Sequence, residues 1–193
     1  MMMVRLNRWS ASGGPAKSRR PTGHCRVDPI ARLFGMVVAA NVAAASPISV
    51  PACYETLLTA YAASNSRDGA LLRAGLARNP TYHAGGWILD IQKAAKAMTL
   101  DANVFVRGEL GLETYIHEMV HVGQYGSIGP TAFLARYVVS SATEIATRLA
   151  RRLPIHPMTA SPFERQAYAL TNRFMHWWRS HPEADPGHSS ASP

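Results

Sequence analysis

The stretch LETYIHEMVHVGQYG, residues 112–126, contains two histidines four positions apart and a glutamate directly after the first. We expect a helix from about Gly111 to Tyr125. Such a helix turns about 100° per residue, so His117 and His121 lie one turn apart on one face and can present two ring nitrogens to one ion. Glu118 points about 100° away, which suits a general base better than a ligand. The H-E-x-x-H pattern therefore predicts a catalytic zinc site, and the alternative is a helix whose two histidines are unrelated.

A zinc ion that does chemistry takes three protein ligands and keeps one open position. Gln124 and Ser127 stand where the metzincin extension of the motif needs a glycine and a third histidine, so that group of peptidases is excluded. The third ligand must come from elsewhere in the chain. The candidates are Glu144, Glu164, His156, His83 and His176.

Glu164 is favoured among them because it lies in the first turn of an expected helix, SPFERQAYAL, that returns antiparallel to the motif helix. A local alternative exists, since Ser161 and Glu164 also form an S-x-x-E capping box. Glu144 is the next candidate, but it can equally pair with Arg148 four residues later. The residue pattern leaves these possibilities open.

The rest of the chain predicts a mainly α-helical domain with a small β-hairpin, an α+β class. Apolar spacing indicates two short helices, or one bent helix, in residues 54–79, a helix from about Pro130 to Arg152, and a last helix that begins at Pro162 after Ser161 as its cap. The segment AMTLDANVFVRG, residues 97–108, alternates after a turn-like LDAN and predicts the hairpin, the only sheet we expect. The domain should span residues 51–180, followed by a disordered tail at 181–193.

Residues 1–50 read as a basic, flexible or signal-like segment. Residues 1–32 hold seven of the 20 basic residues and one of the 12 acidic residues, so most of the formal charge of +8 lies there. No aromatic residue beyond Trp9 interleaves these charges, so we expect no specific nucleic-acid binding. The run LFGMVVAANVAAA, residues 33–45, resembles an export signal cleaved near Ser46, and is too short to span a bilayer. The alternatives are a start of translation at Met36 or another methionine, which would leave a cytoplasmic protein, and a buried first helix.

Three segments in order resemble the metallopeptidase-like core domain associated with extracellular contractile injection systems, a gluzincin-type zincin. They are AMTLDANVFVRG, LETYIHEMVHVGQYGSIGPTAFLARY and SPFERQAYAL, within about residues 97–174. In that family, T-[LI]-x-x-x-[IV]-[FY] precedes the motif helix, HExxHxxQ carries two ligands, and P-[FY]-E-x-x-A supplies an acidic third ligand. His117, Glu118, His121, Gln124 and Glu164 match these positions. The resemblance implies a zincin-like fold with Glu164 as the third ligand.

These observations predict a zinc metallopeptidase with one Zn²⁺ held by His117, His121 and Glu164, acting on a protein or peptide substrate. Glu118 would be the general base, and Tyr168, one turn beyond Glu164, is the candidate donor to the oxyanion, with a core aromatic as the alternative. Gln124 would hold a ligand or the substrate backbone, or be a plain surface residue. Two other functions are considered: a non-catalytic, zinc-stabilised scaffold or effector module of a secretion or injection system, and a binding protein that acts through its basic arm and has the motif incidentally. No pattern indicates an oligomeric state.

Overall fold

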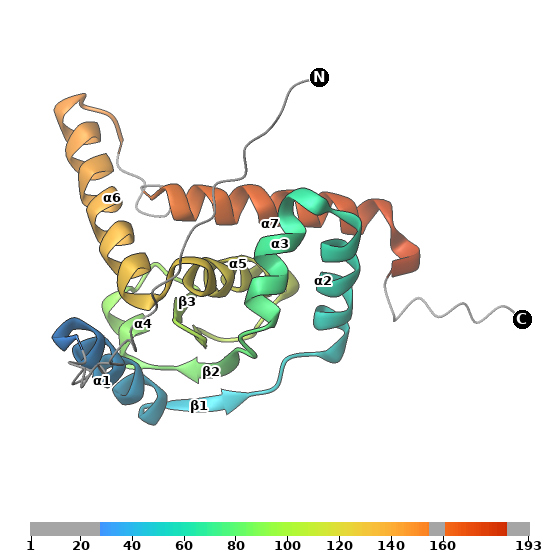
Figure 1. The fold of residues 1–193 in the computed structure, drawn as a ribbon, viewed down its shortest axis with the longest axis horizontal. Helices are drawn as coiled ribbons and strands as arrows, with labels where there is room; N and C mark the ends of the chain where they lie inside the picture. The colour runs from blue at the N-terminus through green and yellow to red at the C-terminus, as the bar shows by residue number, and fades with distance from the viewer. Residues whose placement is uncertain (1–27, 155–160, 185–193) are drawn as a thin grey trace, which may run out of the picture.

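A computed structural model describes residues 28–154 and 161–184, and within them the chain is mainly helical with one four-stranded sheet (Figure 1). The helices are α1 (Pro29–Ala43), α2 (Ala52–Ser64), α3 (Ser66–Leu76), α4 (Trp87–Ile91), α5 (Leu112–Ile128), α6 (Pro130–Ala150) and α7 (Pro162–Ser180), and the 3₁₀ turn η2 (Pro182–Ala184) follows. The strands are β1 (Ala45–Ile48), β2 (Thr81–Gly85), β3 (Ala97–Leu100) and β4 (Asn103–Val106). The expected α+β class is confirmed at this level.

The sheet has the order β1-β2-β4-β3. Strands β3 and β4 form the expected antiparallel hairpin, with Leu100 opposite Asn103. The prediction that this hairpin is the only sheet is wrong, because β2 runs parallel to β4 and β1 pairs antiparallel with β2. The sequence TYHAG of β2 lacks a clear alternation of branched apolar residues. It is a strand because Tyr82 and His83 are buried and its backbone is paired on both sides.

The long helices agree with the sequence pattern. The motif helix α5 starts at Leu112, as expected, and runs on to Ile128. Helix α6 spans Pro130–Ala150. Helix α7 begins at Pro162, and Ser161 caps it by accepting a hydrogen bond from Phe163 N. Two separate short helices, α2 and α3, precede Pro80.

Residues 29–48, expected within a flexible or signal-like segment, form α1 and β1. Side chains of α1 pack on a second apolar core that contains Leu89, Leu100 and Phe105. Asn41 is fully buried, and its Oδ1 accepts a hydrogen bond from Ile88 N at 2.9 Å. The sheet therefore begins before residue 51. Residues 1–27 and 185–193, which hold the rest of the expected segment and tail, lie outside the described residues.

A search of the described residues for a helix long and apolar enough to cross a membrane finds none. This agrees with the expectation from the sequence that the run at residues 33–45 is too short to span a bilayer.

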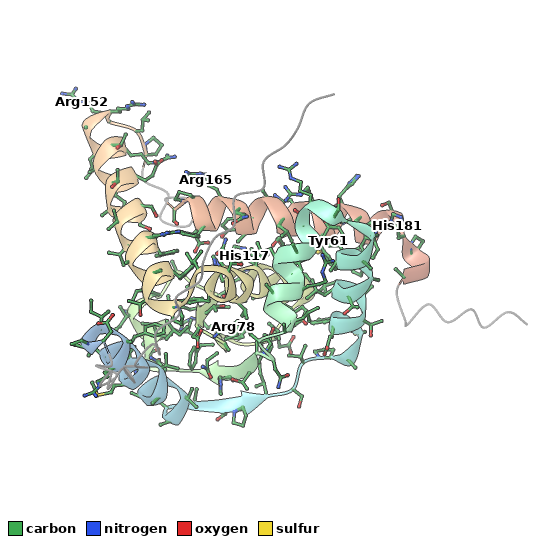
Figure 2. All side chains as sticks on the ribbon, in the orientation of Figure 1. Tyr61, Arg78, His117, Arg152, Arg165 and His181 are labelled. Carbon is green, nitrogen blue, oxygen red and sulfur yellow. The ribbon has the colours of Figure 1, made fainter. Side chains whose placement is uncertain are left out.

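Helix α5 lies in the middle of the main core, packed against α3, α7 and β3 (Figure 1). The crossing of α3 and α5 is close because it is built on glycine. A Cβ at Gly123 would lie 2.3 Å from the carbonyl oxygen of Leu71, and one at Gly75 would lie 2.8 Å from that of Met119. Backbone therefore meets backbone on this side of α5. On another side the labelled His117 lies beside α7 (Figure 2).

Candidate metal centre

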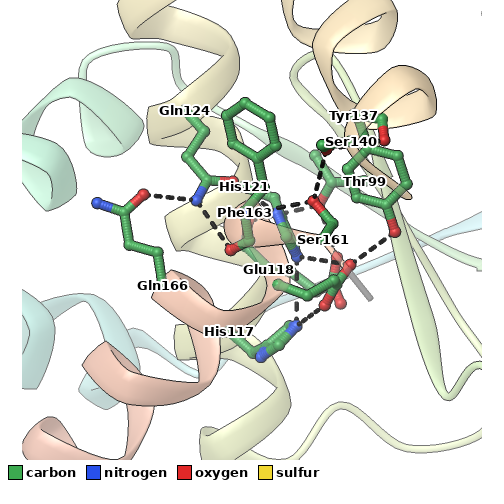
Figure 3. Close-up of polar contacts among 11 residues, drawn as sticks. Thr99, His117, Glu118, His121, Gln124, Tyr137, Ser140, Ser161, Phe163 and Gln166 are labelled. Atoms are coloured by element: carbon green, nitrogen blue, oxygen red, sulfur yellow. Dashed lines mark hydrogen bonds and ion pairs between the residues drawn. The ribbon is translucent and has the colours of Figure 1, made fainter. Parts of the chain in front are cut away.

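Helices α5 and α7 bring three potential metal ligands together (Figure 3). The Nε2 atoms of His117 and His121 are 3.3 Å apart. Oε2 of Glu164 lies 3.3 Å from His117 Nε2, and Oε1 lies 3.4 Å from His121 Nε2. Zinc bonds of about 2.0 to 2.1 Å in a tetrahedron place neighbouring donors about 3.3 to 3.4 Å apart. Each of the three pairs of groups therefore has the spacing of two neighbouring ligands on one metal ion.

Gln124 determines which nitrogen of His121 carries a hydrogen. Gln124 Nε2 lies 3.1 Å from the carbonyl oxygen of Phe163 and 2.9 Å from Gln166 Oε1. A carbonyl oxygen only accepts, so Nε2 is the donor and Gln124 Oε1, 2.8 Å from His121 Nδ1, must be an acceptor. His121 Nδ1 therefore carries the hydrogen. In the neutral ring, Nε2 then presents a bare lone pair to Glu164.

The lone pair of His121 Nε2 and the oxygen of the Glu164 carboxylate repel each other unless a proton or a metal cation lies between them. Burial disfavours the charged form of His121, but the hydrogen bond to Glu164 and the negative charges of Glu118 and Glu164 outweigh burial and raise its pKa. Burial likewise opposes the charge on Glu164, yet its contacts with both imidazoles hold the pKa of that carboxyl far below its ordinary value. The pocket thus favours either a proton or a metal cation. Two imidazoles and one carboxylate suit zinc and other divalent first-row metals.

Glu118 is buried and turned toward the sheet rather than held by the imidazoles. Only 4% of the residue is exposed. Thr99 Oγ1 on β3 donates a hydrogen bond of 2.7 Å to Glu118 Oε2. A carboxylate fixed by one oxygen keeps its other oxygen available for proton transfer. The sequence pattern that contains Thr99, T-L-x-x-x-V-F, offered a signal for this partner, but the residue was not singled out.

Tyr168 lies at the edge of the same site. Its ring centroid is 4.5 Å from that of His117, with the planes tilted by 59°. Burial, together with the negative charge of Glu164, raises the pKa of its hydroxyl, which therefore stays protonated as a donor. The structure thus brings every predicted site residue to one place.

Tyr137 on α6 is a contact that the sequence analysis missed. Its hydroxyl donates a hydrogen bond of 2.9 Å to Glu164 Oε1 (Figure 3). Burial raises the pKa of Tyr137, so this hydroxyl also remains a donor. The sequence predicted a helix here from its apolar spacing, and nothing in that spacing separates a core tyrosine from one at a site.

The other candidates for the third ligand have different partners. Glu144 forms an ion pair with Arg148 at 2.8 Å, as its spacing suggested. His83 contacts Thr81 and Asn103 in the sheet. His176 is exposed on α7, and His156 lies outside the described residues. Of the candidates that the structure describes, Glu164 alone joins the two histidines as a possible metal ligand.

A comparison of the chain with protein-family models, curated proteins and solved structures finds no match. The metal centre is therefore inferred from the residues and their geometry, and family membership stays an expectation from the sequence motifs.

Proposed function

We propose that the protein is a zinc-dependent peptidase that hydrolyses peptide bonds with an activated water molecule. The observation that carries this proposal is the ligand spacing of His117, His121 and Glu164 beside a buried Glu118 that is held by a different partner. The two histidines and Glu164 would hold one zinc ion. When bound, zinc lowers the pKa of a water molecule toward about 7 and polarises the substrate carbonyl.

Glu118 is the general base in this proposal. Thr99 holds its Oε2, so Oε1 accepts a proton from the attacking water and then delivers it to the leaving amine. The small exposure of Glu118 strengthens this role, because a carboxylate shielded from bulk water exchanges its proton with the reactants rather than with solvent.

Tyr168 is the proposed donor to the oxyanion that forms on the substrate carbonyl. It lies on α7 one turn after Glu164, and its ring contacts His117. A protonated hydroxyl at the rim of the site can donate to an oxygen that gains charge in the transition state. A single donor of this kind contributes about 10² to 10³ in kcat.

The resemblance to the metallopeptidase-like core domain supports the same function. That resemblance implies two histidine ligands on one helix, a glutamate base between them and an acidic third ligand on a later helix. The chain has the corresponding residues on α5 and α7, at ligand spacing. We infer a gluzincin-type zincin acting on a protein or peptide substrate.

The deciding experiment compares metal content and peptide cleavage in three proteins. The wild type should purify with about one zinc per chain and cleave an unbiased peptide library. His121→Ala should lose zinc and activity together. Glu118→Gln should keep its zinc and lose about 10² to 10⁴ in rate, the range for removal of a general base.

A wild type that binds zinc but cleaves nothing, like its Glu118→Gln variant, would instead support a zinc-stabilised scaffold or effector module. A wild type without affinity for zinc would overturn the proposal altogether. Deletion of residues 1–27, which leaves α1 intact, tests the remaining possibility of a binding protein that acts through its basic arm. A peptidase should keep its activity after that deletion.

A further inference from the structure

Tyr137 reaches the metal centre from α6, a helix outside both the HExxH segment and the helix of the third ligand. Its hydroxyl donates to Glu164 Oε1, the oxygen that also lies nearest to His121 Nε2. The other oxygen, Oε2, faces His117 Nε2. The three neighbours thus contact both carboxylate oxygens, and together they define the orientation of the carboxylate.

A glutamate carboxylate rotates easily about its last bond, since this torsion is broad and roughly two-fold. Without a further partner, Glu164 can turn so that its oxygens no longer face both imidazoles. A hydroxyl that donates to Oε1 removes this freedom. Orientation of a ligand by an outer hydrogen bond raises metal affinity, and loss of such a partner typically lowers affinity about 10-fold to 100-fold.

The ring of Tyr137 is held in place from two sides. Its centroid lies 5.8 Å from that of Phe133 and 6.4 Å from that of Phe163, with interplanar angles of 30° and 28°. Phe163 directly precedes Glu164, so the donor and its acceptor are positioned by the same contact. A phenylalanine would fill this aromatic cluster equally well. The hydroxyl is therefore not needed for packing, and it donates its hydrogen bond to the candidate ligand.

We propose that Tyr137 is a positioning residue of the metal centre, which holds the Glu164 carboxylate in the orientation that serves both imidazoles. This inference rests on the proposed zinc site, and it makes α6 a third structural component of that site beside α5 and α7. It predicts that removal of the Tyr137 hydroxyl, with the aromatic ring kept, weakens zinc binding more than it lowers the stability of the fold.

The test measures zinc affinity by competition with a chromophoric chelator, and records the absorption spectrum of the Co²⁺-substituted protein. Tyr137→Phe should bind zinc about 10-fold to 100-fold more weakly than the wild type, with a changed Co²⁺ spectrum because the carboxylate is less constrained. The matched control is Tyr82→Phe. Tyr82 is also buried, but its ring packs on that of Tyr115, with 5.7 Å between the centroids, and not at Glu164. This control should leave affinity and spectrum as in the wild type.

A protein with para-aminophenylalanine at position 137 is the second variant. Its amino group restores a donor on the same ring, so it should regain most of the affinity, and this comparison stays decisive if Tyr137→Phe folds poorly. Equal zinc affinity in the wild type and Tyr137→Phe, or no recovery with the amino group, overturns the role of Tyr137 and leaves the proposed peptidase intact. A wild type that binds no zinc overturns both.

Discussion

Replacement of Gln124 by methionine tests the tautomer of His121 on which the metal centre depends. Methionine has nearly the same length and lacks the amide, so Gln124→Met removes the acceptor for His121 Nδ1 and the two donations from Gln124 Nε2. Both residues are buried, with 6% of His121 and 3% of Gln124 exposed. The ring N–H is then left without its partner in a site that water reaches poorly.

Two effects of different size follow from this geometry. An unsatisfied buried polar group costs about 1 to 3 kcal/mol, so the metal-free protein should lose about 2 kcal/mol of unfolding free energy. The imidazole also becomes free to turn or to change tautomer, which should lower zinc affinity about 10-fold to 100-fold. Gln166→Met is the matched control. It removes only one hydrogen bond at an exposed position, and should change stability by less than about 0.5 kcal/mol.

Guanidinium unfolding in excess chelator gives the first quantity, and zinc titration against a chromophoric competitor gives the second. If Gln124→Met loses stability but binds zinc as tightly as the wild type, then Gln124 is only a packing residue. The assignment of the hydrogen to His121 Nδ1 would then carry no consequence for the metal, and the reasoning from tautomer to metal site would be refuted.

Three further changes probe other parts of the structure. Thr99→Val removes the hydroxyl that holds Glu118, and should lower kcat about 10-fold or more in peptide-cleavage kinetics with zinc affinity unchanged; weaker zinc binding would contradict this. Asp68→Asn breaks the pair with the partly exposed Arg173 and should cost about 2 kcal/mol in urea unfolding at neutral pH. Burial opposes the charge on Asp68, but Arg173 outweighs it and lowers the pKa of Asp68. The wild type should therefore lose stability as the pH decreases below about 4, and the variant should lack this loss. Gly123→Ala places a Cβ 2.3 Å from a backbone oxygen of α3 and should cost about 3 kcal/mol in the same assay, whereas a neutral effect would mean that the crossing relaxes.

The sequence predicted the parts of the structure that repeat a local pattern. The motif helix, the two helices after it and the hairpin all follow from periodicity, capping and turn residues, and the structure has them within a few positions. The grouping of His117 with His121 follows from helix geometry alone. The expected return of the last helix favoured Glu164 over its rivals, but a first-turn glutamate is equally explained as a cap, and the resemblance added the case for a ligand.

Features that depend on distant partners could not be predicted. Strand β2 is defined by neighbours on both sides rather than by its own alternation of residues, so the sequence predicted no strand there. Tyr137 and Thr99 take their roles from Glu164 and Glu118, which lie 27 and 19 positions away in the chain. Such pairings between distant residues cannot be predicted from a single sequence unless a known motif includes both residues.

The placement of α1 has a consequence for how this chain can be processed. The segment that resembles an export signal is also the cover of the second apolar core, where Phe34 lies against Tyr125 with ring centroids 6.2 Å apart. Cleavage near Ser46 would strip away that cover and shorten β1, so Leu89 and Phe105 would meet water. A chain that is cleaved there must therefore close this side of the fold in another way.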